Sequence, residues 1–237
     1  MTVDLLALII IFFALLVRAT LGFGDGLVAM PLLTMSIGMQ YAAPIVGLLG
    51  LSMALFIALS SWKDIEFGAA AKLLGAAVFG VPVGVLGLKQ LPSEFLIAGL
   101  AIFLIGFGVY SLLRPTLHAS NKPFWAYALG FLGGMFGGAY NIPGPPVVLY
   151  GSLRQWNPAT FRASVQGFFL VSYSLAVLSH GLTGMWNAHV LKLYLFSLPV
   201  LLLTGILGQY LSKLIEPEMF SKFLYIAIII LGALLFI

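Results

Sequence analysis

Two interruptions of an otherwise hydrophobic helical pattern constrain this chain more than any other feature of its sequence. The first is the glycine-rich segment 22–26, and the second joins a glycine run at 133–138 to three prolines within 143–146. At one constant offset, three residues of the first half align with three of the second: Gly24, Pro31 and Pro44 with Gly138, Pro145 and Pro158. Glycine frees the backbone and proline removes an N–H donor, so neither segment is expected to continue as a regular helix. Paired breaks of this kind are typical of duplicated membrane transporters, in which unwound backbone lines the substrate site.

The rest of the chain is too apolar for a water-soluble domain. Of the 237 residues, 62% are hydrophobic and 8% are charged, whereas soluble domains carry about 25% charged residues. We therefore expect a multi-pass membrane protein, with the lipid bilayer as its solvent. Basic residues form no run, which excludes a nucleic-acid partner. The absence of cysteine excludes disulfides and thiolate metal sites, and we expect no metal and no cofactor.

The lengths of the apolar stretches locate the helical spans, because a membrane-spanning helix needs about 20 apolar residues. Eight stretches come close to this length: 4–21, 41–61, 67–88, 94–113, 124–140, 159–180, 188–211 and 217–237. Two further pieces, near 27–37 and 145–153, are too short to cross and are predicted to be re-entrant half-helices. The predicted fold class is an all-α polytopic membrane protein of about eight transmembrane helices plus two broken half-helix segments.

The duplication divides the chain into an N-terminal repeat, 1–118, and a C-terminal repeat, 119–237, which together are expected to form one integrated membrane domain. Non-helical backbone at membrane depth survives only inside protein or beside water, so both broken segments are expected in the protein interior. Four full spans in each half would make the repeats parallel, whereas an odd number of crossings would make them inverted. The sequence leaves both orientations open.

The segments around both breaks resemble the TauE/SafE family, the sulfite-exporter-like membrane permeases. In that family each half opens with a glycine-rich stretch followed by a proline and leucines, as in 22–33 here. The second half shows the related segments 144–150 and 161–164, and the resemblance extends over nearly the whole chain. It implies transport of a small anion such as sulfite, an organosulfonate or a related organic acid across a prokaryotic cell membrane. Asp25 departs from the pattern, because the family often has another glycine there.

An anion that crosses hydrocarbon needs replacements for its hydration water, and three kinds are available near the breaks. Half-helix N-termini present free N–H groups, glycine allows close approach of the backbone, and arginine offers a planar fork for sulfonate or carboxylate oxygens. On this basis seven residues are candidates for substrate binding: Arg18, Gly24, Asp25, Asn141, Gly144, Arg162 and Gln166. No residue is expected to be catalytic.

The candidates of the second half also have structural interpretations, which the sequence leaves open. Asn141 and Gly144 could mark a structural kink instead of a binding site. Arg162 and Gln166 lie four residues apart on one helix face. Even so, Arg162 could extend its charged end to the membrane interface, and Gln166 could bond to a neighbouring helix.

The titratable residues near the breaks leave more than one interpretation open. Arg18 and Asp25 could form an internal salt bridge that holds the first break shut. Alternatively, Arg18 contacts the substrate while Asp25 takes a coupling proton, since a buried carboxylate holds a proton more readily. A third interpretation places both at the solvated interface. His180 and His189 flank a short loop and are interpreted as interface residues, because no acidic or cysteine partners accompany them.

The leading functional hypothesis is a secondary transporter for a small anion, coupled to a proton or sodium ion or driven by the gradient of the anion itself. An anion channel without coupled alternating access is the alternative, because broken half-helices also build pores. An intramembrane enzyme is not expected, since it needs a nucleophile–base pair or metal ligands at matched depths. A purely structural subunit would not explain why the break occurs twice. Assembly as a homodimer is left open.

Overall fold

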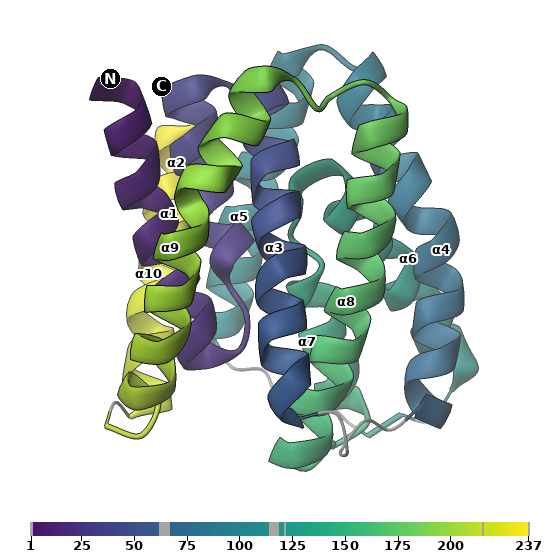
Figure 1. Cartoon of the computed structure of the whole chain (residues 1–237). Coiled ribbons are helices and arrows are strands. Elements are labelled where there is room, and N and C mark those ends of the chain that lie inside the picture. Colours follow the sequence, from purple (N-terminus) through teal and green to yellow (C-terminus); the bar gives the residue numbers. More distant parts are fainter. Residues whose placement is uncertain (1, 62–66, 114–118, 121, 215, 237) are drawn as a thin grey trace. The chain divides into compact units, whose positions relative to one another are not determined.

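The computed structural model describes residues 2–61, 67–113, 119–120, 122–214 and 216–236, and the regular secondary structure in these ranges is helical (Figure 1). The helices are α1 (Thr2–Leu21), α2 (Asp25–Ile37), α3 (Met39–Ser61), α4 (Phe67–Gln90), α5 (Ser93–Leu113), α6 (Pro123–Tyr140), α7 (Gly144–Leu153), α8 (Pro158–Leu182), α9 (Ala188–Leu211) and α10 (Pro217–Leu234). The predicted end of the first repeat, at 118, lies outside the described residues.

Among the described residues, six helices are long and apolar enough to cross a membrane: α1, α3, α4, α5, α8 and α9. They confirm six of the predicted spans by length and composition. Helices α6 and α10, of 18 residues each, do not belong to these six. The short helices α2 and α7, of 13 and 10 residues, occupy the segments predicted to be half-helices. The prediction of an all-helical polytopic membrane protein is therefore confirmed.

Glycine and asparagine end the helices that precede α2 and α7. After α1, Gly22 and Gly24 have φ angles of 87° and 105°, in the left-handed region that costs glycine least. After α6, Asn141 has a φ angle of 52°, and its N–H bonds back to the carbonyls of Gly137 and Phe136, a helix-ending geometry that asparagine tolerates. Both predicted breaks are confirmed as interruptions between separate helices.

The helices form two compact units, each of which combines helices from both predicted repeats. The first unit contains residues 1–49, 90–115 and 186–237, and the second unit contains 50–89 and 116–185. In the first unit, α1 packs on α2 and α9, and α10 packs on α5 and α2. In the second unit, α6, α7 and α8 pack on one another, and α4 packs on α6.

Glycines set the closest helix contacts in the second unit. Three glycines of α6 face the backbone of three residues of α4: Gly130, Gly134 and Gly138 lie against Leu73, Ala77 and Val81. Because both series advance in the same direction, α4 and α6 run parallel. A Cβ at these glycines would collide with the backbone of α4, so small residues are what permits this approach.

In the first unit, glycines likewise allow α5 and α10 to pack closely. Gly232 of α10 lies against the backbone of Ala101, and Gly108 of α5 lies against the carbonyl of Tyr225. Residue numbers rise from 101 to 108 along α5 while their contacts fall from 232 to 225 along α10, so the two helices run antiparallel. Gly208 of α9 similarly approaches Ala19 near the end of α1. These contacts determine which helix faces turn inward in this unit.

Candidate functional site

The first break places Arg18, in the last turn of α1, against Asp25, the first residue of α2. Arg18 Nη1 donates a hydrogen bond to Asp25 Oδ2 at 2.6 Å, and the two side chains expose 0% and 5% of their surface. The interpretation that both residues are solvated at the membrane interface is therefore wrong, because burial leaves neither in contact with bulk water. An internal salt bridge between them is confirmed.

Gly24 shapes this break. Its φ angle of 105° is strained for any residue with a Cβ, and a Cβ there would lie 3.2 Å from Val17 and 3.3 Å from Leu224. The turn puts the Asp25 carboxylate at the N-terminus of α2, where negative charge is favoured. Within α2, the Val28 N–H bonds back to the Gly24 carbonyl at 3.3 Å. A helix N-terminus is a position that favours an anion.

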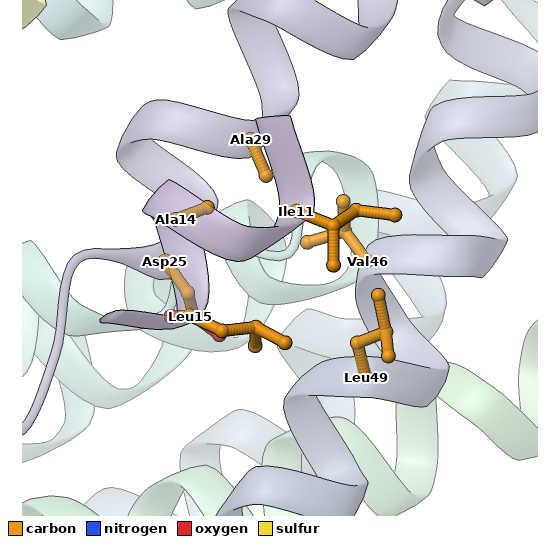
Figure 2. A pocket seen from close by; sticks show the side chains of 7 residues that line it. All are labelled: Ile11, Ala14, Leu15, Asp25, Ala29, Val46 and Leu49. Carbon is orange, nitrogen blue, oxygen red and sulfur yellow. The ribbon is translucent and has the colours of Figure 1, made fainter. Parts of the chain in front are cut away.

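A small cavity lies beside Asp25 inside the first unit (Figure 2). Its water-accessible volume is about 10 Å³, roughly what one water molecule needs. Seven side chains from α1, α2 and α3 line it: Ile11, Ala14, Leu15, Asp25, Ala29, Val46 and Leu49. The surface that faces this space is apolar. The space is too small for a polyatomic anion, so the first break is closed around its salt bridge.

The second break centres on Asn141, whose side chain is fully buried. Its carbonyl accepts a hydrogen bond from the Tyr173 hydroxyl of α8 at 3.1 Å, and its N–H helps to end α6. The backbone of Asn141 therefore serves the fold. Any recognition of a ligand by this residue falls to its side-chain amide, which can both donate and accept hydrogen bonds.

Gly144 is buried and begins α7, and Pro145 and Pro146 follow it directly. Proline, which has no N–H, fits the first turn of a helix because the N–H groups of that turn have no partner within the helix. The same two prolines remove donors that a helix N-terminus would offer to an anion. The beginning of α7 is therefore a weaker anion site than the beginning of α2, which has no proline in its first turn.

Helix α8 turns buried polar side chains toward the interior of the second unit. Gln166, Tyr173 and His180 are buried, and their seven-residue spacing, close to two helical turns, places them near one face. Ser172, on an adjacent row, is buried and lies beside Gly137 of α6. Tyr173, Ser172 and His180 therefore lie against residues of the second break and of the end of α6, namely Asn141, Gly137 and Gly138.

The sequence candidates therefore fall into two groups. The three candidates of the first half meet at the first break. Asn141, Gly144 and Gln166 are buried in the second unit. Arg162 lies in α8, but its side chain is outside the described residues. Within the described ranges, no three His, Asp or Glu side chains gather, so these residues form no ready-made metal cluster.

His180 is a candidate that the sequence interpretation missed. It is fully buried in the protein, and its assignment to the depth of the membrane interface stays a prediction. It lies near the end of α8, and Gly138 of α6 lies beside the ring. The seven-residue spacing from Tyr173 was the signal in the sequence. His189, in contrast, is exposed and meets Tyr41 edge-on at 5.6 Å.

Comparison with known proteins gives the family. The family model described as sulfite exporter TauE/SafE matches residues 7–235, which include both breaks. A curated relative from Cupriavidus necator, named as a probable sulfite/organosulfonate exporter TauE, is 25% identical over 221 residues, covering 90% of this chain and 85% of the relative. No solved structure matches. The resemblance read from the two breaks is confirmed, and an enzymatic function is excluded: the chain belongs to the sulfite exporter TauE/SafE family of multi-pass membrane transporters.

Proposed function

We propose that this protein is a secondary transporter for a small anion, with sulfite or an organosulfonate as the leading substrate class. The observation that carries the proposal is the burial of a charged pair and an asparagine at two helix breaks of an apolar chain. Ionisable groups inside a membrane protein are costly and mark substrate or ion pathways by default. The substrate class follows from the family description and from the name of the relative in Cupriavidus necator.

The proposal includes eight crossing helices, four in each half. Helices α5 and α10 hold equivalent places in their halves and pack along one another in the first unit. The parallel pair α6 and α4 of the second unit corresponds to the pair α1 and α9 of the first. These relations support α6 and α10 as the two remaining crossings, with α2 and α7 as half-helices.

Arg18 is the strongest recognition element for an anion at the first break. Its guanidinium fork suits the oxygens of sulfite or a sulfonate, and the N–H groups at the beginning of α2 add to the attraction. The Asp25 carboxylate holds this fork in the structure. We expect the substrate to take the place of that carboxylate. Because the adjoining cavity has a volume of about 10 Å³, too small for a polyatomic anion, the exchange requires the break to open, which favours a carrier over a permanently open channel.

A binding screen tests the substrate class. Purified protein is heated with sulfite, thiosulfate, taurine, sulfoacetate, isethionate and simple carboxylates. A ligand that binds the folded state raises the melting temperature by mass action, with about 2.7 kcal/mol of stabilisation at one hundred times Kd. We expect a shift with a sulfur oxyanion and a smaller shift in Arg18→Lys, which keeps the charge and loses the fork. Arg154→Lys, the same exchange at the half-exposed residue that caps α7, is the matched control.

Counterflow in proteoliposomes separates carrier from channel. A carrier exchanges labelled anion outside for unlabelled anion inside, so unlabelled internal anion accelerates uptake. A channel gives high flux without this acceleration. The proposal is wrong if none of the screened anions shifts the melting temperature and none is transported.

A further inference from the structure

The second unit contains one buried side chain of a type that titrates near neutral pH. Its described residues, 50–61, 67–89, 119–120 and 122–185, include no Asp or Glu. Its buried polar residues are Asn141, Ser164, Gln166, Ser172 and His180. Histidine alone among these types has an ordinary pKa near neutrality, about 6.5. A proton bound inside this part of the protein therefore has His180 as its natural acceptor.

The His180 ring lies at the C-terminal end of α6, beside the second break. The Gly138 carbonyl is next to the ring, and neither ring nitrogen has a hydrogen-bond partner of ordinary geometry. Gly138 is within the last three residues of α6, where carbonyls lack partners inside the helix and carry partial negative charge. A helix C-terminus attracts cations, and this attraction offsets part of the cost that burial in apolar surroundings places on a charged ring.

The other elements packed around this position are mainly apolar. Val81 and Val85 of α4 form a buried cluster with Ala176, one turn before His180. Helices α6 and α7 and the described part of α3 in this unit contain no charged residue. The titratable groups of α6 and α7 are tyrosines, which titrate far above neutral pH. These elements therefore add no charge that would compete with a proton on the ring.

Lys89, at the end of α4, is the charged group linked to this end of α8. Its Nζ donates to the Thr183 carbonyl at 3.2 Å, and the Thr183 hydroxyl donates to the His180 carbonyl at 3.2 Å. Lys89 is exposed, so its charge acts on the ring from the solvated side. A positive charge there opposes protonation of the ring, which makes Lys89 a means of adjusting the site without entering it.

We propose that His180 binds the coupling proton that moves in the same direction as the anion. The inference rests on the proposed transport function and names the coupling ion. A proton from water on one side adds to the lone pair of a ring nitrogen and leaves to water on the other side, and no other bond changes. The positive ring and the negative substrate then occupy the protein together. One proton per monovalent sulfonate makes the transport electroneutral.

The test uses proteoliposomes with isethionate as the probe. In the wild type, a pH gradient with the acidic side outside should drive accumulation of about tenfold per pH unit for one coupled proton, independent of membrane potential. His180→Gln should lose this accumulation while keeping counterflow at equal pH. His189→Gln, the same exchange at an exposed histidine, should behave as the wild type.

Each outcome discriminates between the two proposals. Accumulation that survives in His180→Gln overturns the proton role of His180. A wild type that exchanges isethionate but ignores the pH gradient overturns it as well, and leaves the transport function standing. A wild type that exchanges none of the screened anions overturns the transport function and the inference that rests on it.

A second variant tests the same role if His180→Gln does not fold. Lys89→Glu places a negative charge at the exposed end of α4, which favours the protonated ring. In this variant, the pH at which transport is half-maximal should be higher than in the wild type, most clearly at low salt. Lys213→Glu, a charge reversal at an exposed lysine of the first unit, should leave the midpoint in place. An unchanged midpoint in Lys89→Glu overturns the proposal.

Discussion

Substituting Asp25 by Asn tests the salt bridge at the first break. The variant keeps the size of the side chain and removes its charge, so Arg18 stays fully buried without its carboxylate partner. Breaking a buried ion pair by removing one partner costs about 3–5 kcal/mol, because a buried charge loses its compensation. The amide oxygen of asparagine can still accept a hydrogen bond from Arg18, so we expect a loss near 3 kcal/mol, the lower end of about 3–5 kcal/mol.

The assay measures the free energy of reversible unfolding in detergent for the wild type, both single variants and the double variant, which together form a double-mutant cycle. Arg18→Met removes the charge on the other side, and the double variant Arg18→Met with Asp25→Asn should recover much of the loss, with a coupling energy of about 2–3 kcal/mol. Glu94→Gln is the matched control, because it makes the same acid-to-amide exchange at an exposed position of the first unit. It should change the free energy of unfolding by less than about 0.5 kcal/mol.

The result that refutes this reasoning is an Asp25→Asn variant as stable as the Glu94→Gln control. If such a variant also lost pH-driven transport and kept counterflow, Asp25 would carry the coupling proton. That outcome would restore the second interpretation of this pair and contradict the role given to His180.

Substitutions at Gly134, Asn141 and Tyr173 test the second unit, with Gly106 of the first unit as a control. Gly134→Ala should lower the free energy of unfolding by about 1–3 kcal/mol through overpacking, because the new Cβ would lie 2.7 Å from the Ala77 carbonyl oxygen. Gly106→Ala is the control, because a Cβ at Gly106 would have no atom within 4 Å. It should leave the protein equally stable or more stable in the same unfolding assay. Asn141→Gly should keep the fold and lose the ligand-induced thermal shift, whereas Asn141→Ala should also cost about 1–2 kcal/mol in the left-handed conformation. Tyr173→Phe should cost about 1 kcal/mol in unfolding free energy, since it removes the hydrogen bond to the Asn141 carbonyl; equal stability would show that this bond does not hold the break.

Local features of the structure were predictable because their causes are local. The helix ends at Gly24 and Asn141 follow from backbone preferences that the residues carry with them. The short lengths of α2 and α7 follow from the spacing of glycine and proline. Six spans follow from composition alone. None of these depends on which helices meet.

The site was only partly predictable, because side-chain environments depend on packing. Sequence reasoning placed Arg18 and Asp25 in the correct region and left three interpretations of them. It assigned His180 to the interface from its position near a span end, and only the packing of the helices shows that this side chain is fully buried. The second-half candidates Asn141, Gly144, Arg162 and Gln166 stay predictions for substrate binding.

The sequence by itself determined the membrane class, the family and the two helix breaks, because apolar length and backbone freedom act over a few residues at a time. Only the tertiary structure decided that Arg18 forms a salt bridge with Asp25 and that glycines of α6 lie against α4. It also decided that His180 is buried beside Gly138. Those facts join residues that are distant along the chain or differ in depth. Their physical cause is the close packing of whole helices, which no short stretch of sequence contains.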